Sequence, residues 1–459
     1  MSNHLEESNI YSKSKTESRS TVDEQIIGSI AKIADVKVDS SWQAISRSKL
    51  TLALRAFKHR NYKLFFGGQL ISLTGTWMQL VAQSWLVYKL TGSAAMLGFV
   101  GFSGQIPVFL LAPIGGAFAD RHNRRNIIVF TQTASMLLAF ALAALTLTNR
   151  VQVWHIFALA SLLGMVNALD IPTRQAFVVD MVGKDDVINA IALNSTMFNS
   201  ARIIGPAVAG VLLETIGEGW CFFVNAVSYI AVIVGLMLMR IEMQQHIRSR
   251  GSTLDNIVEG FHYVAHSRPV RALLLMLGLF SLLAMPYVVL MPIFADKILR
   301  HGASGLGLLM GASGIGALAG ALTLATRQGV HGLGRWVAFS AVGFGVGLIL
   351  FSLSRWFWVS ALLLLPVGFS MIVQMASSNT LIQVMVPDNL RGRVMAVYSM
   401  MFMGMAPFGA LLAGTIAQHL GAPTTLMIGG LVCIAAAAAF WLRLPALRYE
   451  ARQVIISNV

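Results

Sequence analysis

Three charged residues lie inside long apolar stretches of this sequence, where charge is otherwise almost absent. Asp170 and Arg174 are four residues apart, so a helix places them on one face, and Arg202 follows in the next apolar stretch. Inside a bilayer an isolated charge costs about 3 kcal/mol or more, so each of them must pair or face a cavity. We predict that Asp170 is the main proton-coupling carboxylate, with Arg174 or Arg202 as its partner. A permanent structural ion pair is the alternative interpretation.

We predict that amide side chains line a substrate cavity together with these charges. Gln69, Gln79 and Gln83 recur within one stretch at a spacing close to one helical face. A cavity with two arginines, several amides and one acid suits a polar or anionic solute better than a lipophilic cation. For each amide, a place in a plain helix–helix contact is the alternative. The predicted cavity set is Asp170, Arg174, Arg202, Asn199, Gln69, Gln79, Gln83, Gln374 and Asn379.

Twelve long apolar runs must position these residues. The chain is 56% hydrophobic and only 12% charged, which is about half the charged fraction of a usual soluble protein. Because roughly 20 apolar residues span a bilayer core of about 30 Å, we predict an all-α integral membrane protein with twelve transmembrane helices. The expected spans are 65–90, 93–118, 127–148, 153–181, 189–213, 220–240, 271–295, 304–325, 336–354, 356–385, 394–416 and 422–442.

The composition also argues against several classes of function. The net charge of +14 is scattered over short loops and forms no single patch, which argues against a nucleic-acid partner. Cys221 and Cys433 both lie in apolar runs, so they provide no disulfide framework and no metal-ligand spacing. The sequence has neither a phosphate-binding Gly-Lys-Ser/Thr loop nor a nucleophile–base pair. We therefore expect no cofactor, no bound metal and no enzymatic activity.

The basic residues of the loops set the expected orientation. Twenty-two lysines and arginines fall on the side of the N-terminus, and five fall on the other side, namely Lys89, Arg150, Lys297, Arg300 and Arg355. The positive-inside rule then predicts that both termini are cytoplasmic. The expected organisation is a disordered cytoplasmic tail (1–50), a six-helix bundle (51–240), a cytoplasmic linker (241–270), a second six-helix bundle (271–442) and a cytoplasmic tail (443–459).

The two halves of the chain resemble each other. Under a shift of 204 residues without a gap, residues 182–198 fall on residues 386–402. The same shift matches four glycine pairs, which are Gly164 with Gly368, Gly205 with Gly409, Gly210 with Gly414 and Gly217 with Gly421. These matches indicate a duplicated six-helix unit. Two such units around a central cavity are typical of an alternating-access transporter.

The loop after the second span carries a recognisable motif. Its sequence, Gly116-Ala-Phe-Ala-Asp120-Arg121-His-Asn-Arg124-Arg125, resembles the G-x-x-x-D-R-x-G-R-R loop of the major facilitator superfamily. The resemblance implies that superfamily's fold, with twelve helices in two pseudo-repeated bundles. Asn123 stands where the family has glycine, and the turn is expected to survive because asparagine also tolerates a left-handed backbone.

The resemblance also implies a cytoplasmic gate. In the family, this loop holds the outward-facing state closed on the cytoplasmic side. Asp120 would accept hydrogen bonds from a facing helix end, and Arg124 would pair with Asp180 on the fourth span. The predicted gate set is Gly116, Asp120, Arg121, Arg124, Arg125 and Asp180. A simple basic topology signal is the alternative interpretation.

A second motif narrows the family. Gly205-Pro206-Ala-Val-Ala-Gly210 resembles a fifth-helix G-P-x-x-x-G element associated with exporters, although a packing kink would give the same letters. Residues 67–79, 85–93 and 170–177 resemble the branch of transmembrane secretion effectors and enterobactin exporter-like transporters. That branch implies proton-driven efflux of a siderophore or similar metabolite across the bacterial inner membrane.

Several alternatives stay open. A multidrug/proton antiporter is the first, although the first span lacks the acidic residue that many such proteins place there. An importer or lipid-type solute carrier is the second, and a non-transporting receptor or enzyme is the third. The expected partners are a small-molecule substrate, protons and the lipid bilayer. The resemblance further implies a monomer.

Overall fold

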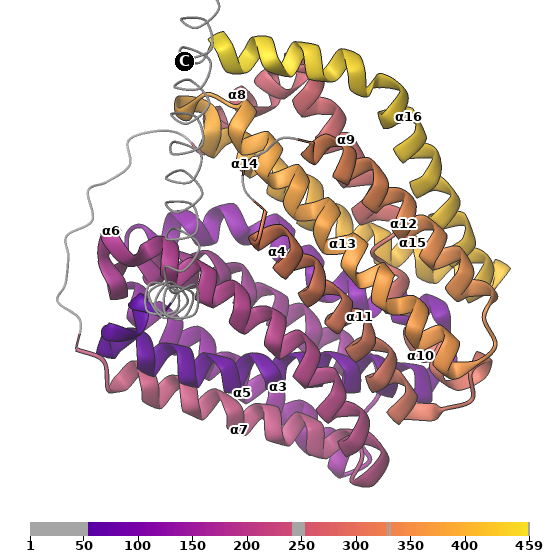
Figure 1. Ribbon diagram of the computed structural model, residues 1–459. Coiled ribbons are helices and arrows are strands. Elements are labelled where there is room, and N and C mark those ends of the chain that lie inside the picture. The colour runs from indigo at the N-terminus through magenta and orange to yellow at the C-terminus, as the bar shows by residue number, and fades with distance from the viewer. Residues whose placement is uncertain (1–53, 241–252, 328, 330–331, 458–459) are drawn as a thin grey trace, which may run out of the picture. The chain divides into compact units, whose positions relative to one another are not determined.

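The computed structural model describes residues 54–240, 253–327, 329 and 332–457 (Figure 1). The chain divides into two units, Met1–Lys58 and His59–Val459. Of the first unit the structure describes only the end, with a short 3-10 helix at Arg55–Lys58. The predicted disordered tail, residues 1–50, lies outside the described residues.

The first half of the second unit is a bundle of long helices, drawn in indigo to pink in Figure 1. We call it the first bundle. The helix α6 is interrupted at Gly183, whose φ of 72° and ψ of 178° end one span and start the next. The interruption divides α6 into the spans Val153–Gly183 and Asp185–Thr215. The helices are α3 (Arg60–Thr91), α4 (Ala94–Ala119), α5 (Arg124–Leu147), α6 (Val153–Thr215) and α7 (Glu218–Met237).

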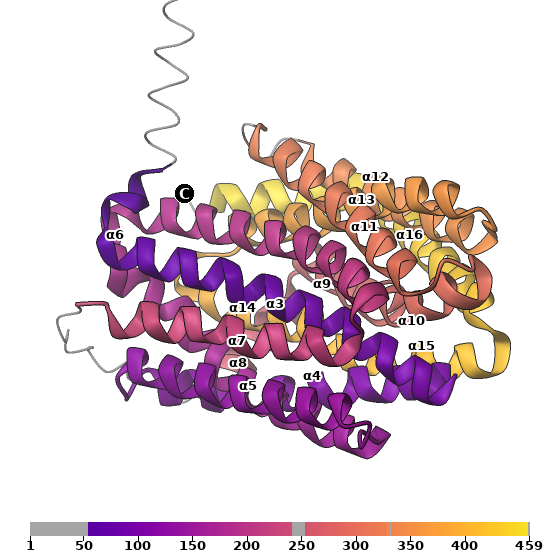
Figure 2. The same ribbon diagram turned by 90° about the horizontal axis from the view of Figure 1, so that it is seen from below.

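The second half repeats this arrangement, with α11, α12, α13 and α16 grouped together in Figure 2. We call it the second bundle. Its first span breaks before Tyr287, where Pro286 cannot donate a backbone hydrogen bond, and a later span breaks at Gly404. The helices are α9 (Arg268–Leu283), α10 (Tyr287–Ile293), the π-helix η2 (Phe294–Ile298), α11 (Gly302–Ala325), α12 (Leu333–Leu353), α13 (Phe357–Met385), α14 (Asp388–Met403), α15 (Met405–Leu420) and α16 (Ala422–Ser457).

Eleven helical segments of the described chain are long and apolar enough to cross a membrane. The prediction of an all-α membrane protein built from two bundles is confirmed. The first predicted span corresponds to α3, which is not among the eleven. Polar residues such as Gln69 and Gln79 lower the mean hydropathy of α3 and are buried where it packs against α6 and α7. The exact number of twelve stays a prediction.

The predicted repeat is visible in equivalent glycine contacts. A Cβ atom on Gly210 would lie 3.2 Å from the Cα of Gly307 in the opposite bundle, and one on Gly414 would lie 2.8 Å from the Cα of Gly98. Gly217 and Gly421 each precede a helix with a left-handed backbone, at φ 85° and 83°. A side chain would clash at Gly414, crowd the facing helix at Gly210 and strain the backbone at Gly217 and Gly421. The glycines therefore mark the same structural places in both halves.

The helices run between two ends, which we name after residues of the first bundle. At the Asp120 end lie Asp120, Gly183 and the end of α7, and at the Glu218 end lie Leu147 and Glu218. The bundles contact each other mainly through α4 with α15 and through α6 with α11. One apolar core includes residues from both bundles. Close packing of α4 with α15 and of α6 with α11 therefore forms the seam between the two bundles.

Two elements are not evident from hydropathy. The predicted linker contains the helix α8 (Thr253–His266), which packs on α14 through an ion pair of Glu259 with Arg393. The helix α16 continues past Pro445 as far as Ser457, so the predicted tail 443–459 is helical up to that residue. Both segments carry charged residues, and mean hydropathy detects apolar runs rather than polar helices.

Candidate functional site

Asp170 lies inside the first bundle at the centre of a hydrogen-bonded cluster. Its residue exposure is 3%, and its Oδ1 accepts hydrogen bonds from Thr131 Oγ1 at 2.7 Å and Gln132 Nε2 at 2.9 Å. Arg174 Nη2 lies 3.4 Å from Asp170 Oδ2. The structure therefore joins Asp170 with Arg174, one of the two partners that the sequence allows. A charged carboxylate at this depth is stabilised by one cation and two dipolar donors.

Arg202 lies elsewhere, at the seam between the bundles. Its guanidinium carbon is 5.7 Å from the centre of the Trp77 ring, and its Nη2 is 3.4 Å from Met371 Sδ in the second bundle. The Tyr287 hydroxyl is also near. Within the described chain, no carboxylate lies at ion-pair distance from Arg202. A ring face and a sulfur compensate a guanidinium poorly, so the charge of Arg202 is only partly compensated among the described residues.

The three predicted amides of α3 lie in different environments. Gln79 Oε1 accepts a hydrogen bond of 2.5 Å from Asn225 Nδ2, which is the helix–helix contact given above as the alternative. Gln69 is 1% exposed, and its Oε1 has no hydrogen-bond partner in the part of the chain that the structure describes. Gln83 is partly exposed. The three amides therefore do not form one cavity lining.

The remaining predicted amides are equally dispersed. Asn199 donates to the carbonyl of Ser195 in its own helix, and Asn379 accepts from Gln383 at 2.7 Å. Gln374 is fully buried, and neither polar atom of its amide has a partner among the described residues. Under the 204-residue shift Gln374 is the counterpart of Asp170. The second bundle thus holds a neutral group where the first holds a carboxylate.

The fifth-helix element lies between two helices of different bundles. A Cβ on Gly205 would lie 2.5 Å from the Cβ of Trp77 on α3. Gly210 packs on Gly307 of α11, and a Cβ on Gly307 would meet the carbonyl of Pro206 at 2.5 Å. Small residues allow this close crossing. Arg202 lies one turn before Gly205 and is itself in contact with the second bundle.

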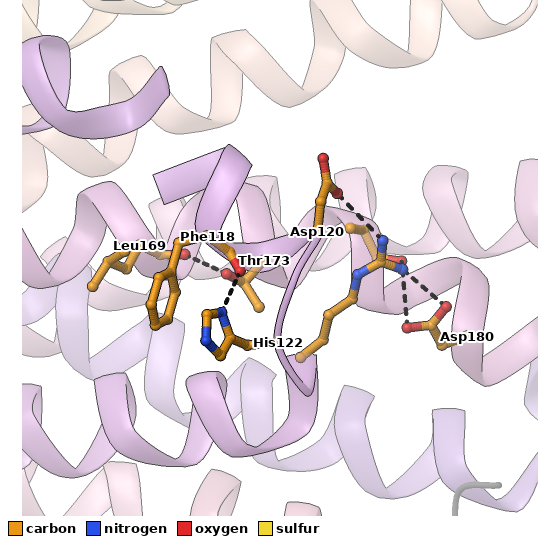
Figure 3. Close-up of polar contacts among 8 residues, drawn as sticks. Phe118, Asp120, His122, Leu169, Thr173 and Asp180 are labelled. Carbon is orange, nitrogen blue, oxygen red and sulfur yellow. Dashed lines mark hydrogen bonds and ion pairs between the residues drawn. The ribbon is translucent and has the colours of Figure 1, made fainter. Parts of the chain in front are cut away.

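The loop motif forms a network at the Asp120 end, shown in Figure 3. Arg124 Nη1 donates to both carboxylate oxygens of Asp180, at 3.0 and 3.1 Å, and Arg124 Nη2 is 3.6 Å from Asp120 Oδ1. Arg125 donates to the carbonyls of Leu236 and Met237 at the end of α7. These contacts fasten α4, α5, α6 and α7 together within the first bundle.

Other residues of the loop are not engaged in this way. Arg121 is exposed, and Gly116 lies partly exposed on α4 with open space where a side chain would be. The Asp120 side chain is 63% exposed, and its ion pair in the described chain is with Arg124. A contact of Asp120 with the second bundle stays a prediction.

The explanation given for Asn123 is wrong. Its backbone is extended, at φ −65° and ψ 110°, rather than left-handed. Asn123 Oδ1 instead accepts a hydrogen bond of 3.2 Å from the Asn126 backbone N–H and caps α5. Asparagine is among the preferred N-cap residues because its side chain satisfies an otherwise unpaired donor.

The Arg124–Asp180 pair gives a first testable prediction. Both side chains are mostly buried, with 13% and 14% exposed. We expect Arg124→Ala to lower the free energy of unfolding by about 2 kcal/mol, because it removes two charge-assisted hydrogen bonds. The matched control Arg121→Ala removes an exposed arginine of the same loop and should change little. Thermal unfolding of the purified variants measures both, and equal stability would refute a structural role for the pair.

A separate set of contacts joins the bundles at the Glu218 end. The Tyr88 hydroxyl donates to Asp296 Oδ2 at 3.0 Å, and Lys297 Nζ lies 6.0 Å from the centre of the Tyr88 ring. Ser93 Oγ donates to Gln418 Oε1 at 3.0 Å. The bundles are therefore in contact at this end of the described chain.

Sequence reasoning missed several groups around the charges. Thr131 and Gln132 interrupt the apolar run of α5, and that interruption is the available signal for them. Trp77, Tyr287 and Met371 surround Arg202 but are ordinary members of apolar helices. Nothing in their spacing marks them, because the fold alone brings these helices together.

The sequence of this chain is similar to a known protein family and to individual transporters. The family model described as transmembrane secretion effector matches residues 51–458. The chain is 28% identical over 382 residues to the staphyloferrin A transporter of Staphylococcus aureus, covering 81% of this chain and 94% of that protein. It is 26% identical over 365 residues to the multidrug efflux pump Tap of Mycolicibacterium fortuitum, covering 77% and 88%.

Solved structures are similar in fold. The nucleoside transporter NupG superposes with a TM-score of 0.66 at 16% identity, over 86% of this chain and 99% of that chain. A bacterial homologue of the iron transporter ferroportin, in its inward-facing state, gives a TM-score of 0.62 at 17% identity, over 83% and 98%. At these identities the similarity concerns the fold alone.

Proposed function

Because the chain belongs to the transmembrane secretion effector family of major facilitator superfamily transporters, we propose that it exports an anionic polar metabolite, such as a siderophore, in exchange for protons. The protein is a multi-pass membrane transporter of small molecules, as its family is. The proposed location is the bacterial inner membrane. The Asp120 end and both termini would then face the cytoplasm, as the distribution of lysine and arginine favours.

One observation carries the proposed substrate class. Arg202 lies at the seam between the bundles, and within the described chain it has no carboxylate partner. A cation in the membrane without a counter-charge is costly, so an anionic substrate that enters the seam would stabilise it. Arg202 is therefore the proposed substrate-binding charge.

The proposed coupling group is separate from the substrate-binding charge. Asp170 is enclosed in the first bundle together with Arg174, Thr131 and Gln132. Protonation of Asp170 would leave Arg174 without its counter-charge and thereby change the packing of α5 and α6. Such a change can bias one of two arrangements of the bundles, which is what alternating access requires.

Multidrug efflux is the second candidate, and aromatic contacts favour it. Trp77 of α3 and Phe198 of α6 are in edge-to-face contact, with ring centres 5.6 Å apart, and Phe198 is 46% exposed. Exposed aromatic faces suit lipophilic cations. The similarity to the Tap efflux pump supports the same candidate.

Proton leak from acidified inverted vesicles separates the two candidates. Addition of a catecholate or hydroxamate siderophore should release protons in vesicles that contain the protein and not in vesicles without it. A response to lipophilic cations alone would replace metabolite export by multidrug efflux. No response to either class, with intact vesicles and normal protein content, would contradict proton-coupled export.

A further inference from the structure

A pocket lined by basic residues lies at the Glu218 end, apart from the groups assigned to transport. Its volume is about 490 Å³. The pocket opens between the loop after η2 and the loop after α12. Its lining residues are Lys297, Ile298, Leu299, Arg300 and Arg355.

The position of these cations is unusual for this sequence. The loops of the Glu218 end contain five lysines and arginines in all, and three of them line this one pocket. Of the other two, Lys89 forms an ion pair of 2.9 Å with Glu218, and Arg150 is exposed. A membrane protein that keeps most basic residues off this side thus places three of the five that it has there in a single pocket.

Among the residues that the structure describes, neither Lys297 nor Arg300 nor Arg355 forms an ion pair. Arg355 Nη1 donates to the carbonyls of Ser352 and Ser354, which leaves its other nitrogen donors free of protein acceptors in that part of the chain. The neighbouring Asp296 accepts the hydrogen bond from Tyr88 instead of pairing with a cation.

The backbone around the pocket is also irregular. Arg300 has a left-handed backbone, with φ 55°, which is uncommon for residues other than glycine and asparagine. It follows the π-helix η2, a form that is rare and frequently found at functional sites. This segment carries two of the three cations on one short turn.

We infer that this pocket binds an oxyanion with two or more negative charges, through its phosphate or carboxylate groups. Arginine presents paired donors that fit such oxygens, and lysine adds a compact charge. The oxyanion can be the headgroup of an anionic lipid in the adjacent leaflet or a soluble phosphate or polycarboxylate. The site stands independently of the proposed substrate and direction of transport.

The experiment uses the full-length protein and three probes. Purified protein in non-ionic detergent is titrated at constant ionic strength with inorganic phosphate and with citrate, and thermal unfolding reports binding. Nanodiscs of phosphatidylcholine, with or without phosphatidylglycerol, supply the lipid probe. The test variant is Lys297→Gln with Arg300→Gln, and the matched control is Arg150→Gln, an exposed arginine at the same end.

We expect saturable stabilisation by at least one probe in the wild type and in the control. The double variant should bind that probe at least about fivefold more weakly, since exposed ion pairs contribute modestly but add up. Stabilisation by phosphatidylglycerol alone identifies a lipid headgroup, and stabilisation by citrate or phosphate alone identifies a soluble anion. If the double variant does not fold, Lys297→Gln alone should bind about twofold more weakly. No saturable effect in the wild type, or equal affinity in wild type and variant, overturns the inference.

Discussion

Replacing Arg202 with glutamine is expected to lower transport of anionic substrates by at least about tenfold, because a charge-assisted hydrogen bond contributes about 1.5–3 kcal/mol. The guanidinium lies partly buried against Trp77 and Met371 at the seam, where a lowered local dielectric strengthens its interaction with an anion. Efflux of a radiolabelled siderophore from intact cells measures the effect. Arg202→Lys keeps the charge but not the paired donors and should retain part of the activity.

A structural role for Arg202 predicts a different pattern. If the guanidinium held the bundles together, Arg202→Gln would lower the thermal stability as well as the transport rate. An uncompensated cation is instead a cost to the folded state, so its neutralisation should leave the stability unchanged or raise it. Arg150→Gln, which removes an exposed arginine, is the matched control for loss of charge. Normal efflux by a stable Arg202→Gln protein would contradict the proposed binding role.

The sequence predicts the helices well because membrane spans need long apolar runs. Eleven of the expected spans match helices of the structure to within a few residues at most ends. The helix α3 shows the limit of this reasoning. Gln69 and Gln79 are buried in it, and Gln79 bonds to Asn225 of α7, so α3 has the length of a span but a lower hydropathy.

The repeat could be predicted because glycine contacts impose strict spacing. Gly210 and Gly414 must both be small where the two bundles cross, and the sequence shows this as a fixed shift. The breaks before Tyr287 and at Gly404 are not evident, because prolines and glycines occur throughout the transmembrane helices. Only packing decides which of them interrupts a helix.

The candidate site could be predicted in its charges but not in its arrangement. Helical spacing allows Asp170 to meet Arg174, and the antiparallel order of the spans also allows it to meet Arg202. The rotation of each helix about its own axis determines which of the two arginines Asp170 contacts. Tertiary packing sets that rotation. The same reason explains the dispersed amides, since Gln79 pairs with Asn225 on α7 whereas Gln374 is buried in the second bundle.

The ion pair of Asp170 with Arg174 determines which variants can distinguish a coupling role from a structural role for Asp170. The carboxylate is 3% exposed and lies beside Arg174, so Asp170→Asn alone leaves a cation without its partner. Breaking a buried pair in this way typically costs about 3–5 kcal/mol, so we expect less folded protein in the membrane. Loss of transport by this single variant would therefore not separate the two roles.

The double variant Asp170→Asn with Arg174→Gln resolves this ambiguity. It replaces the ion pair by two neutral amides, while Thr131 and Gln132 can still donate to the amide carbonyl introduced at position 170. We expect its abundance to return toward that of the wild type, because no charge stays unpaired. Substrate exchange between equal concentrations should persist, whereas substrate-driven proton release from inverted vesicles should fall to the level of vesicles without the protein. Glu218→Gln, a neutralised acid at a helix end, is the matched control. Proton release at the wild-type rate in the double variant would make Asp170 a structural partner of Arg174 and move the coupling site elsewhere.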